Sequence, residues 1–384
     1  MYILSRYLIH SVAVTSLAGI LLFVFLLITG NAMRDILGLL ADGTIPLSLF
    51  LKLLWLLVPY AFSFAMPLGV LIGILLTMGR LSANQELTAF KAAGVSLYSI
   101  ASPALFVALC GSMLAVYINT IHAPEARANY KAILNDLVRT DPLRFIVPRK
   151  FIHDFSGYVF YVGETEKNRL QDVWIWDLDD KKRAVRLLRA DDGTVTFDEQ
   201  ADALVLTLLN GFTELRDEKN PDDLSVRHPS LLFEEARVRL PLANLLGAAH
   251  QPRRIANYRM QELRQRKLEM DAIVASGTAP PEELEEARKT GQQVQYHISR
   301  RFAMAASVFS LALFAVPLGI RVGRTETHAN FAIAIAIAMT YYVVLVVIGW
   351  LEHSPNLRPD LLVWGPNIVA QVLGFWLLIR AQRA

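Results

Sequence analysis

The sequence predicts a membrane α-helical bundle of six transmembrane helices with an inserted all-β, jellyroll-like domain. The chain of 384 residues is 54% hydrophobic and only 19% charged, whereas soluble proteins carry about 25% charged residues. Six long stretches contain no Asp, Glu, Lys or Arg, and a long connection rich in β-forming residues separates the third stretch from the fourth. This combination excludes a soluble enzyme, a disordered protein and a disulfide scaffold.

Each uncharged stretch is long enough to cross a hydrocarbon core about 30 Å thick as a helix. In chain order the stretches are Tyr7–Thr29, Leu53–Met78, Leu97–Ile121, Phe302–Ile320, Phe331–Leu351 and Leu361–Ile379. The first is longer than a signal-peptide core and no small-residue cleavage motif follows it, so we expect it to be retained. The single cysteine, Cys110, lies in the third stretch, which excludes an intramolecular disulfide. Gly69 and Gly73 in the second, and Gly319 with Gly323, fit close helix packing.

Lysines and arginines in the short connections predict that both termini are cytoplasmic. With the N-terminus inside, the inner short segments carry seven basic residues, namely Arg6, Arg80, Lys91, Arg321, Arg324, Arg380 and Arg383. The outer short connections carry only Arg34 and Arg358. Long loops cross the membrane largely regardless of charge and are not counted. The net charge of +3 indicates no nucleic-acid partner, which would require a concentrated basic face.

The connection His122–Arg300 is long enough for a domain with its own core. Short β-forming runs occupy its middle, at 158–162, 172–177, 203–209 and 212–216. Asn210-Gly211 predicts a hairpin turn between the last two runs, and 179–182 and Asp191-Asp192-Gly193 predict further turns. Six or more short strands without helices between them favour a sandwich, a jelly roll or an open barrel.

Two charged, helix-favouring segments follow, Tyr258–Ala275 and Pro281–Arg301, separated by a Gly- and Pro-containing turn. They predict a helical hairpin that leads into the fourth span. The predicted organisation is therefore three transmembrane helices at 1–121, with a short cytoplasmic helix at about 82–94, a β-domain at 122–252, the helical hairpin at 253–300 and three further transmembrane helices at 301–384.

Motifs for catalysis are absent from the sequence. Gly38–Gly43 has the glycine spacing of a phosphate loop, but Thr44 stands where the loop requires Lys. The eight histidines are scattered and form no Cys/His pattern, so no metal site is predicted. The spans also lack the Asp and Glu residues that a secondary transporter uses. We therefore do not expect the chain to be an enzyme.

The connection between the second and third spans predicts a short cytoplasmic helix. Ser82 or Asn84 can cap its start, and Gly94 can end it. Glu86 and Phe90 share one face of this helix, which can dock into another protein. The alternative is an interfacial helix that only holds the loop in place, with Phe90 facing lipid.

Basic residues on the predicted outer side suggest a rim for an anionic lipid headgroup, since Arg and Lys bind phosphates well. They are Arg34, Lys52, Arg127 and Lys131. Arg127 and Lys131 are four residues apart and therefore share a helix face. The alternative is that these are solvated charges or long side chains that reach to the membrane surface.

Four features together resemble a known family. They are Arg6-Tyr7 with Ile36–Gly38 and Asp42–Pro46; Pro67-Leu68 with Arg80-Leu81, Glu86-Leu87, Ala92, Gly94 and Ser96; Tyr296-His297 and Arg300–Phe302 with Val316–Arg321; and the order of three spans, a β-domain and three spans. In this combination the chain resembles the lipopolysaccharide export permeases, the LptF/LptG family of Gram-negative envelopes. The Ile36–Pro46 stretch is closer to the LptF branch.

The resemblance implies a heterodimer of two homologous permeases on an LptB-like ATPase dimer in the bacterial inner membrane. The β-domain would be a periplasmic jellyroll that continues into LptC-like and LptA-like proteins and forms a bridge for lipopolysaccharide. Spans one and five would be lateral gates. ATP and Mg would be used by the partner ATPase, and no cofactor is expected on this chain. The short helix matches the family's coupling helix, whose expected contact residues here are Glu86, Leu87, Phe90, Lys91 and Gly94.

The sequence thus predicts a permease subunit that extracts lipopolysaccharide from the inner membrane and passes it to a periplasmic bridge, powered by a separate ATPase. One alternative is a membrane scaffold that does not transport and whose β-domain binds envelope proteins. A secondary lipid transporter is a weaker alternative, because its membrane carboxylates are missing.

Overall fold

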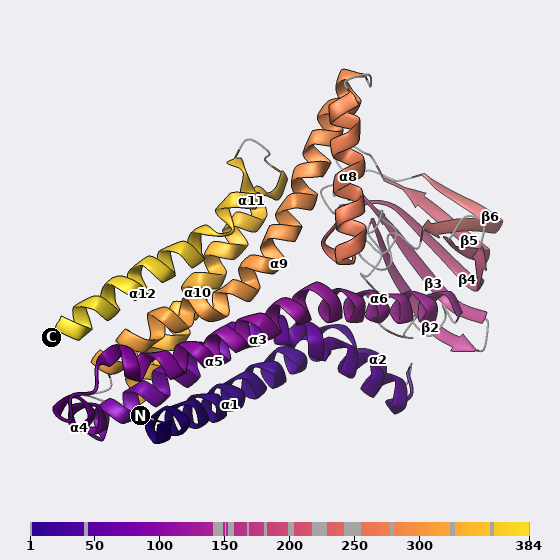
Figure 1. Ribbon diagram of the computed structural model, residues 1–384. Coiled ribbons are helices and arrows are strands. Elements are labelled where there is room, and N and C mark those ends of the chain that lie inside the picture. Colours follow the sequence, from indigo (N-terminus) through magenta and orange to yellow (C-terminus); the bar gives the residue numbers. More distant parts are fainter. Residues whose placement is uncertain are drawn as a thin grey trace. The chain divides into compact units, whose positions relative to one another are not determined.

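The computed structural model (Figure 1) describes residues 2–41, 45–140, 149, 151–152, 157–166, 169–179, 183–198, 203–216, 229–241, 255–276, 280–322, 327–353 and 357–383. The chain forms two compact units. Met1–Asp35, Leu51–Ala128 and Ile255–Ala384 make up the first, and Ile36–Phe50 with Asn129–Arg254 the second. Asp42–Thr44, Arg324 and most of the predicted turn at 179–182 lie outside the described residues.

Among the described residues, six helices are long and apolar enough to cross a membrane, which confirms the predicted number. Their cores belong to α1 (Tyr2–Asp35), α3 (Leu47–Ala83), α5 (Leu97–Tyr117), α9 (Pro281–Val322), α10 (Thr327–Trp350) and α12 (Gly365–Arg383). Shorter helices are α2 (Leu37–Ala41), α4 (Glu86–Ala92), α6 (Ala123–Thr140), α8 (Met260–Ser276) and α11 (Pro359–Leu362), with the π-helix η1 (Ile118–His122) and the 3₁₀ turns η3 (Ile255–Asn257) and η4 (Leu351–His353).

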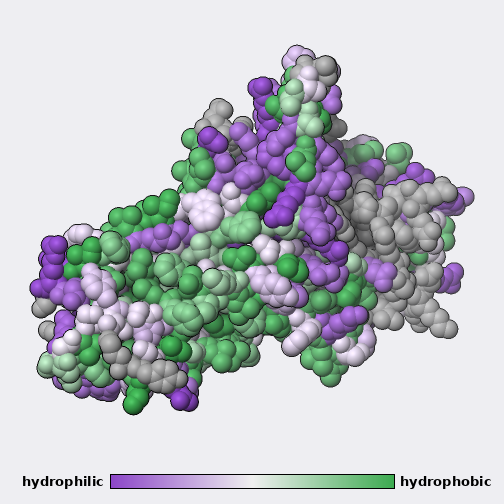
Figure 2. Space-filling view, viewed as in Figure 1, coloured by the Kyte–Doolittle hydropathy of each residue, from purple (hydrophilic) through white to green (hydrophobic). Residues whose placement is uncertain are grey.

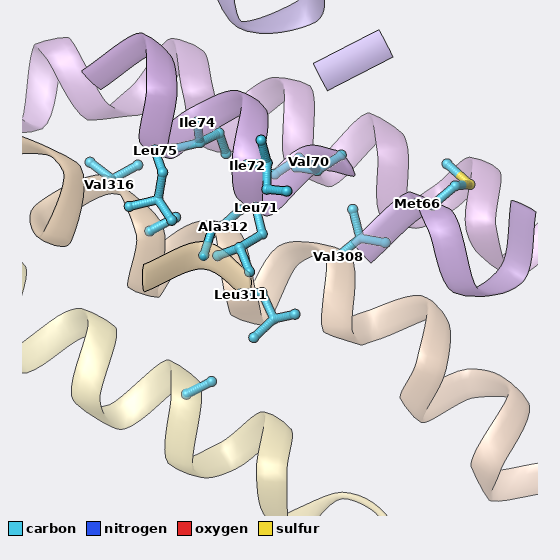
Figure 3. Packing of buried hydrophobic residues seen from close by; sticks show 14 of the residues in the cluster. Met66, Val70, Leu71, Ile72, Ile74, Leu75, Val308, Leu311, Ala312 and Val316 are labelled. Atoms are coloured by element: carbon cyan, nitrogen blue, oxygen red, sulfur yellow. The ribbon is translucent and has the colours of Figure 1, made fainter. Parts of the chain in front are cut away.

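Helices α3 and α9 form the centre of the membrane unit. Their most apolar windows are 83% and 67% buried, against 22–28% for the other four spans. Leu71 and Leu75 of α3 pack toward Leu311 and Val316 of α9 (Figure 3). The peripheral helices expose apolar side chains, and Figure 2 shows this apolar surface over the bundle, with hydrophilic residues gathered on the α8–α9 hairpin. Such an outer surface is what a helix bundle in lipid requires.

Small residues bring α1 and α3 into backbone contact. A Cβ atom on Gly69 would lie 2.4 Å from the Ile20 nitrogen, and one on Gly73 would lie 2.5 Å from the Ser16 Cα. Both distances are far below van der Waals contact, so only glycine fits at these two positions. The predicted close packing at Gly69 and Gly73 is therefore confirmed, whereas Gly323 lies outside the described residues.

The described strands of the second unit form one antiparallel sheet of six strands, in the order β1-β2-β3-β4-β5-β6. Each strand pairs with its neighbour in sequence, as in a meander. The strands are β1 (Phe151–Ile152), β2 (Tyr158–Glu166), β3 (Arg169–Leu178), β4 (Ala184–Asp198), β5 (Ala203–Leu215) and β6 (Ser230–Pro241). One face carries a core that includes Val173, Ile175, Leu188 and Leu206. An all-β domain inserted between the membrane helices is confirmed.

The predicted hairpin at Asn210-Gly211 is wrong, because β5 runs straight through it. Likewise, β4 runs through the turn predicted at Asp191–Gly193. Both sites lie on one line that crosses the sheet from β2 to β6. Along this line, one residue pair is missing from the otherwise continuous pairing of each two neighbouring strands. Asn210 and Asp172 on this line have φ of 51°. The turn-forming residues distort the strands locally instead of reversing the chain.

Candidate functional site

The short helix predicted between the second and third spans is present as α4 (Glu86–Ala92). The residue before it, Gln85, has φ of 62° and makes no side-chain cap, so the expected cap by Ser82 or Asn84 is wrong. Ser82 instead donates a hydrogen bond to the Ile320 carbonyl of α9 at 2.9 Å. At the other end Gly94 has φ of 82°, the left-handed conformation expected of a helix-ending glycine.

The predicted contact residues of α4 divide between the bundle and the surface. Leu87 is buried, and Phe90 is half-buried and packs against the core of the bundle. Lys91 and Gly94 are exposed. These contacts fix α4 to the bundle through two apolar side chains and leave its polar side accessible.

The Glu86 carboxylate connects α4 to α1. The Tyr7 hydroxyl donates to Glu86 Oε2 at 3.3 Å, and the Asn84 amide donates to Oε1 at 3.4 Å. The ion pairs among the described residues do not include Glu86. Both donors are neutral, so a cationic group of another protein can still form an ion pair with this carboxylate.

An apolar groove of about 490 Å³ runs between α1, α3 and α10. Its lining includes Phe23, Leu68, Ile335, Met339, Val343 and Trp350. Tyr342 also lines it, but its hydroxyl donates to the Phe64 carbonyl of α3 at 2.8 Å. The groove therefore exposes almost only carbon, and its shape and chemistry suit an acyl chain.

A second cavity, of about 110 Å³, lies in the same unit between α3, η1, α6 and α9. Its polar lining comprises Tyr60, Ser63, Asn119, Arg127, His297, Arg300 and Arg301. The Arg127 guanidinium stacks 4.7 Å from the centre of the Tyr60 ring, a cation–π geometry that holds this long side chain in place. Three arginines therefore line one cavity, at the place where α3, η1, α6 and α9 come together.

Hydrogen bonds and ion pairs fix the walls of this arginine cavity. Arg301 Nη2 donates to the Tyr258 carbonyl at 2.5 Å. His297 Nε2 lies 2.8 Å from Glu352 Oε1, which connects α9 to η4 at the end of α10. The side chains of Arg301 and His297 are thus held by partners distant in sequence.

The structure places the four predicted headgroup residues in different surroundings. Arg127 lines the arginine cavity, while Lys52 is exposed and is not among the lining residues. Lys131 is half-buried in the other compact unit, and the side chain of Arg34 lies outside the described residues. The geometry thus groups Arg127 with Arg300 and Arg301.

Arg300 and Arg301 were not among the predicted site residues. They stand directly before the fourth uncharged stretch, where arginines commonly mark the membrane surface. The available signal was the pair of adjacent arginines followed by a span. The two arginines line a cavity because the π-helical turn η1 places Asn119 beside Arg301. Sequence patterns do not predict such turns.

Comparison with known proteins shows a family match along nearly the whole chain and individual relatives that align with half of it. A family model described as lipopolysaccharide export system permease LptF/LptG matches residues 6–380. The lipopolysaccharide export system permease proteins LptF of Escherichia coli K12 and of Shigella flexneri are each 28% identical over 198 residues. That alignment covers 50% of this chain, which spans 53% of each relative, about half their length.

Proposed function

The chain belongs to the lipopolysaccharide export permease family LptF/LptG, and on that premise we propose that it is a subunit of a lipopolysaccharide exporter in the bacterial inner membrane. The family match along 6–380 is the observation that carries the proposal. The LptF names of the relatives agree with the predicted LptF branch. The six apolar helices fit a multi-pass membrane protein.

The apolar groove gives the proposed transport step a physical basis. Exposing an acyl chain to water costs about 0.8 kcal/mol for each CH₂ group. A lipid with several acyl chains therefore needs an apolar path out of the bilayer. The groove between α1 and α10 supplies one, and it lies at the two spans that the family resemblance assigns to lateral gates.

The energy for extraction comes, in this proposal, from a separate LptB-like ATPase dimer that binds ATP and Mg. We propose that α4 is its docking element, through Glu86, Leu87, Phe90, Lys91 and Gly94. Because the Tyr7 hydroxyl bonds to the Glu86 carboxylate, a movement of α4 acts directly on α1. The chain itself is proposed to bind no cofactor.

The β-domain is proposed to pass the lipid to periplasmic bridge proteins of the LptC and LptA type. Strand β6 is at one edge of the described sheet and exposes Leu231 and Leu232, which are 58% and 91% accessible. An open edge strand is a template for pairing with a further strand. We propose further that a second, LptG-like permease completes the membrane complex, with both termini of this chain cytoplasmic.

Charge reversal at Glu86 tests the coupling proposal. We expect Glu86→Lys to abolish co-purification of the ATPase, or to separate ATP hydrolysis from transport, because an attractive contact becomes repulsive. Glu282→Lys is the matched control, since Glu282 is also a glutamate in the first turn of a helix but belongs to α9, far along the chain from α4. Normal assembly and transport with Glu86→Lys would refute the docking role of α4, and absence of any ATPase from the native complex would favour the scaffold alternative.

A further inference from the structure

The geometry of the arginine cavity points to a binding site for a phosphate group, held by Arg127, Arg300 and Arg301. Two helices supply these guanidinium groups, α6 for the first and α9 for the other two. Arginine binds phosphate through paired N–H donors in a fixed fork, so three forks around one small cavity form a strong anion site.

The charge balance around the cavity favours an anion. Its lining, in the described part of the chain, contains three arginines and no Asp or Glu. The nearby carboxylates have other partners: Glu125 pairs with Arg259 at 3.4 Å, and Glu352 with His297 at 2.8 Å. Glu262 attracts Arg301, but it also accepts a hydrogen bond from the Arg259 backbone at 2.7 Å. A surplus of positive charge therefore remains at the cavity.

Two residues of the lining each have a buried side-chain atom without a hydrogen-bond partner among the described residues, namely Arg301 Nη1 and Asn119 Oδ1. Such atoms are costly in a folded protein unless a ligand or water completes them. A phosphate oxygen satisfies the arginine donor, and the proton of a singly protonated phosphate, or a bridging water, satisfies the amide oxygen. In this proposal, one bound anion provides a hydrogen-bond partner for each of the two atoms.

Local structure forms the cavity. The π-helical turn η1 interrupts the run from α5 into α6 and buries Asn119 against α9, where its amide lies 3.5 Å from the Arg301 carbonyl. π-Helical turns are frequent at functional sites. The cavity of about 110 Å³ also exceeds the roughly 30 Å³ that one water occupies, so it has room for a tetrahedral oxyanion.

The phosphate has two possible sources, a lipid headgroup or free inorganic phosphate. The lipid source rests on the proposed function, since the phosphates of lipopolysaccharide would then be the ligand. The anion site itself does not depend on transport. Binding is therefore measured on the purified full chain in detergent, without an ATPase, so that failure of the transport proposal leaves this result unaffected.

The test compares diphosphoryl lipid A, lipid A without phosphates and inorganic phosphate as probes. The matched variants are Arg300→Gln, Arg127→Gln and Arg288→Gln; Arg288 is exposed on α9 and lies outside the cavity lining. We expect a phosphate-bearing probe to raise the melting temperature of the wild type, and its dissociation constant to rise about tenfold or more in the first two variants but not in Arg288→Gln.

The outcomes separate the sources. Loss of diphosphoryl lipid A binding, with the dephosphorylated lipid unaffected, establishes the lipid headgroup as ligand. Loss of inorganic phosphate binding alone establishes a free-phosphate site. Equal affinity of the wild type, both cavity variants and Arg288→Gln for every probe would overturn the inference. Circular dichroism and unliganded melting temperatures exclude misfolded variants, and Arg300→Lys, which keeps the charge but loses the fork, provides a second measure if Arg300→Gln does not fold.

Discussion

At the scale of single residues, the contact of α1 with α3 depends on the absence of side chains. Gly69 and Gly73 let the two backbones approach, and the Thr15 and Thr77 hydroxyls then lie 2.8 Å apart. Arg80 donates to the Ser11 hydroxyl at 2.6 Å along the same interface. In a membrane, where lipid is as apolar as the helices, such close packing and polar contacts hold helices together.

Replacing Gly73 with alanine tests this interface. The new methyl would lie 2.5 Å from the Ser16 Cα, so α1 and α3 must separate, and we expect a loss of about 1–3 kcal/mol of stability. Gly30→Ala is the control, since nothing lies within 4 Å of its added Cβ. Melting temperatures of the purified variants measure the difference. Equal stability of the two variants would contradict backbone contact at Gly73.

At the scale of elements, β5 remains one strand although it contains Asn210-Gly211, a sequence that strongly favours a turn. Asn210 takes the left-handed conformation, but the residues on both sides pair with β4 and with β6 in unchanged register. A hairpin turn of the predicted type needs positive φ at both central residues, and only Asn210 of the pair has it. Pairing on two sides keeps the chain extended.

A β-branched residue at position 210 should strain this strand. We expect Asn210→Val to destabilise the β-domain by about 1–2 kcal/mol, because a left-handed φ is unfavourable for such side chains. Asn210→Gly should keep or improve stability, since glycine adopts this conformation freely. Limited proteolysis of the full-length protein across a denaturant series compares the two variants. A Val variant as resistant as the Gly variant would show that Asn210 is not held at positive φ.

At the scale of the whole molecule, the proposed path for lipid begins at the groove between α1, α3 and α10. These helices come from the first and the second half of the sequence, and α10 is only partly covered by protein. Because few protein contacts hold α10 beside the groove, little free energy is needed to displace it. Lipid entry at this position requires no break in the α3–α9 core.

Site-specific photo-crosslinking distinguishes the groove from ordinary lipid-facing surface. We expect a photoreactive residue at Val343 of the groove to capture lipopolysaccharide in an ATP-dependent manner, because the proposed path of the acyl chains passes there. Val369 of α12 is the matched control, since both side chains are 58% exposed but only Val343 lines the groove. Equal, ATP-independent capture at both positions would contradict transport through the groove.

The number of spans, the inserted β-domain and the short helix at Glu86 were predictable, because each follows from composition or periodicity within one segment. The hairpin at Asn210-Gly211 and the cap at Ser82 were wrong for a common reason. In both cases a partner distant in sequence, a neighbouring strand or the Ile320 carbonyl, outweighed the local preference. The predicted headgroup residues stay predictions, and only Arg127 lines the cavity.

The amino-acid sequence alone was enough to predict six helices apolar enough to cross a membrane and the position of the inserted β-domain. Hydrophobicity decides these properties, and it is additive along the chain. Only the tertiary structure decided that Arg127 meets Arg300 and Arg301, and that Phe23 and Val343 share a groove. Such convergence depends on how helices pack, and packing is set by the shape of all partners together.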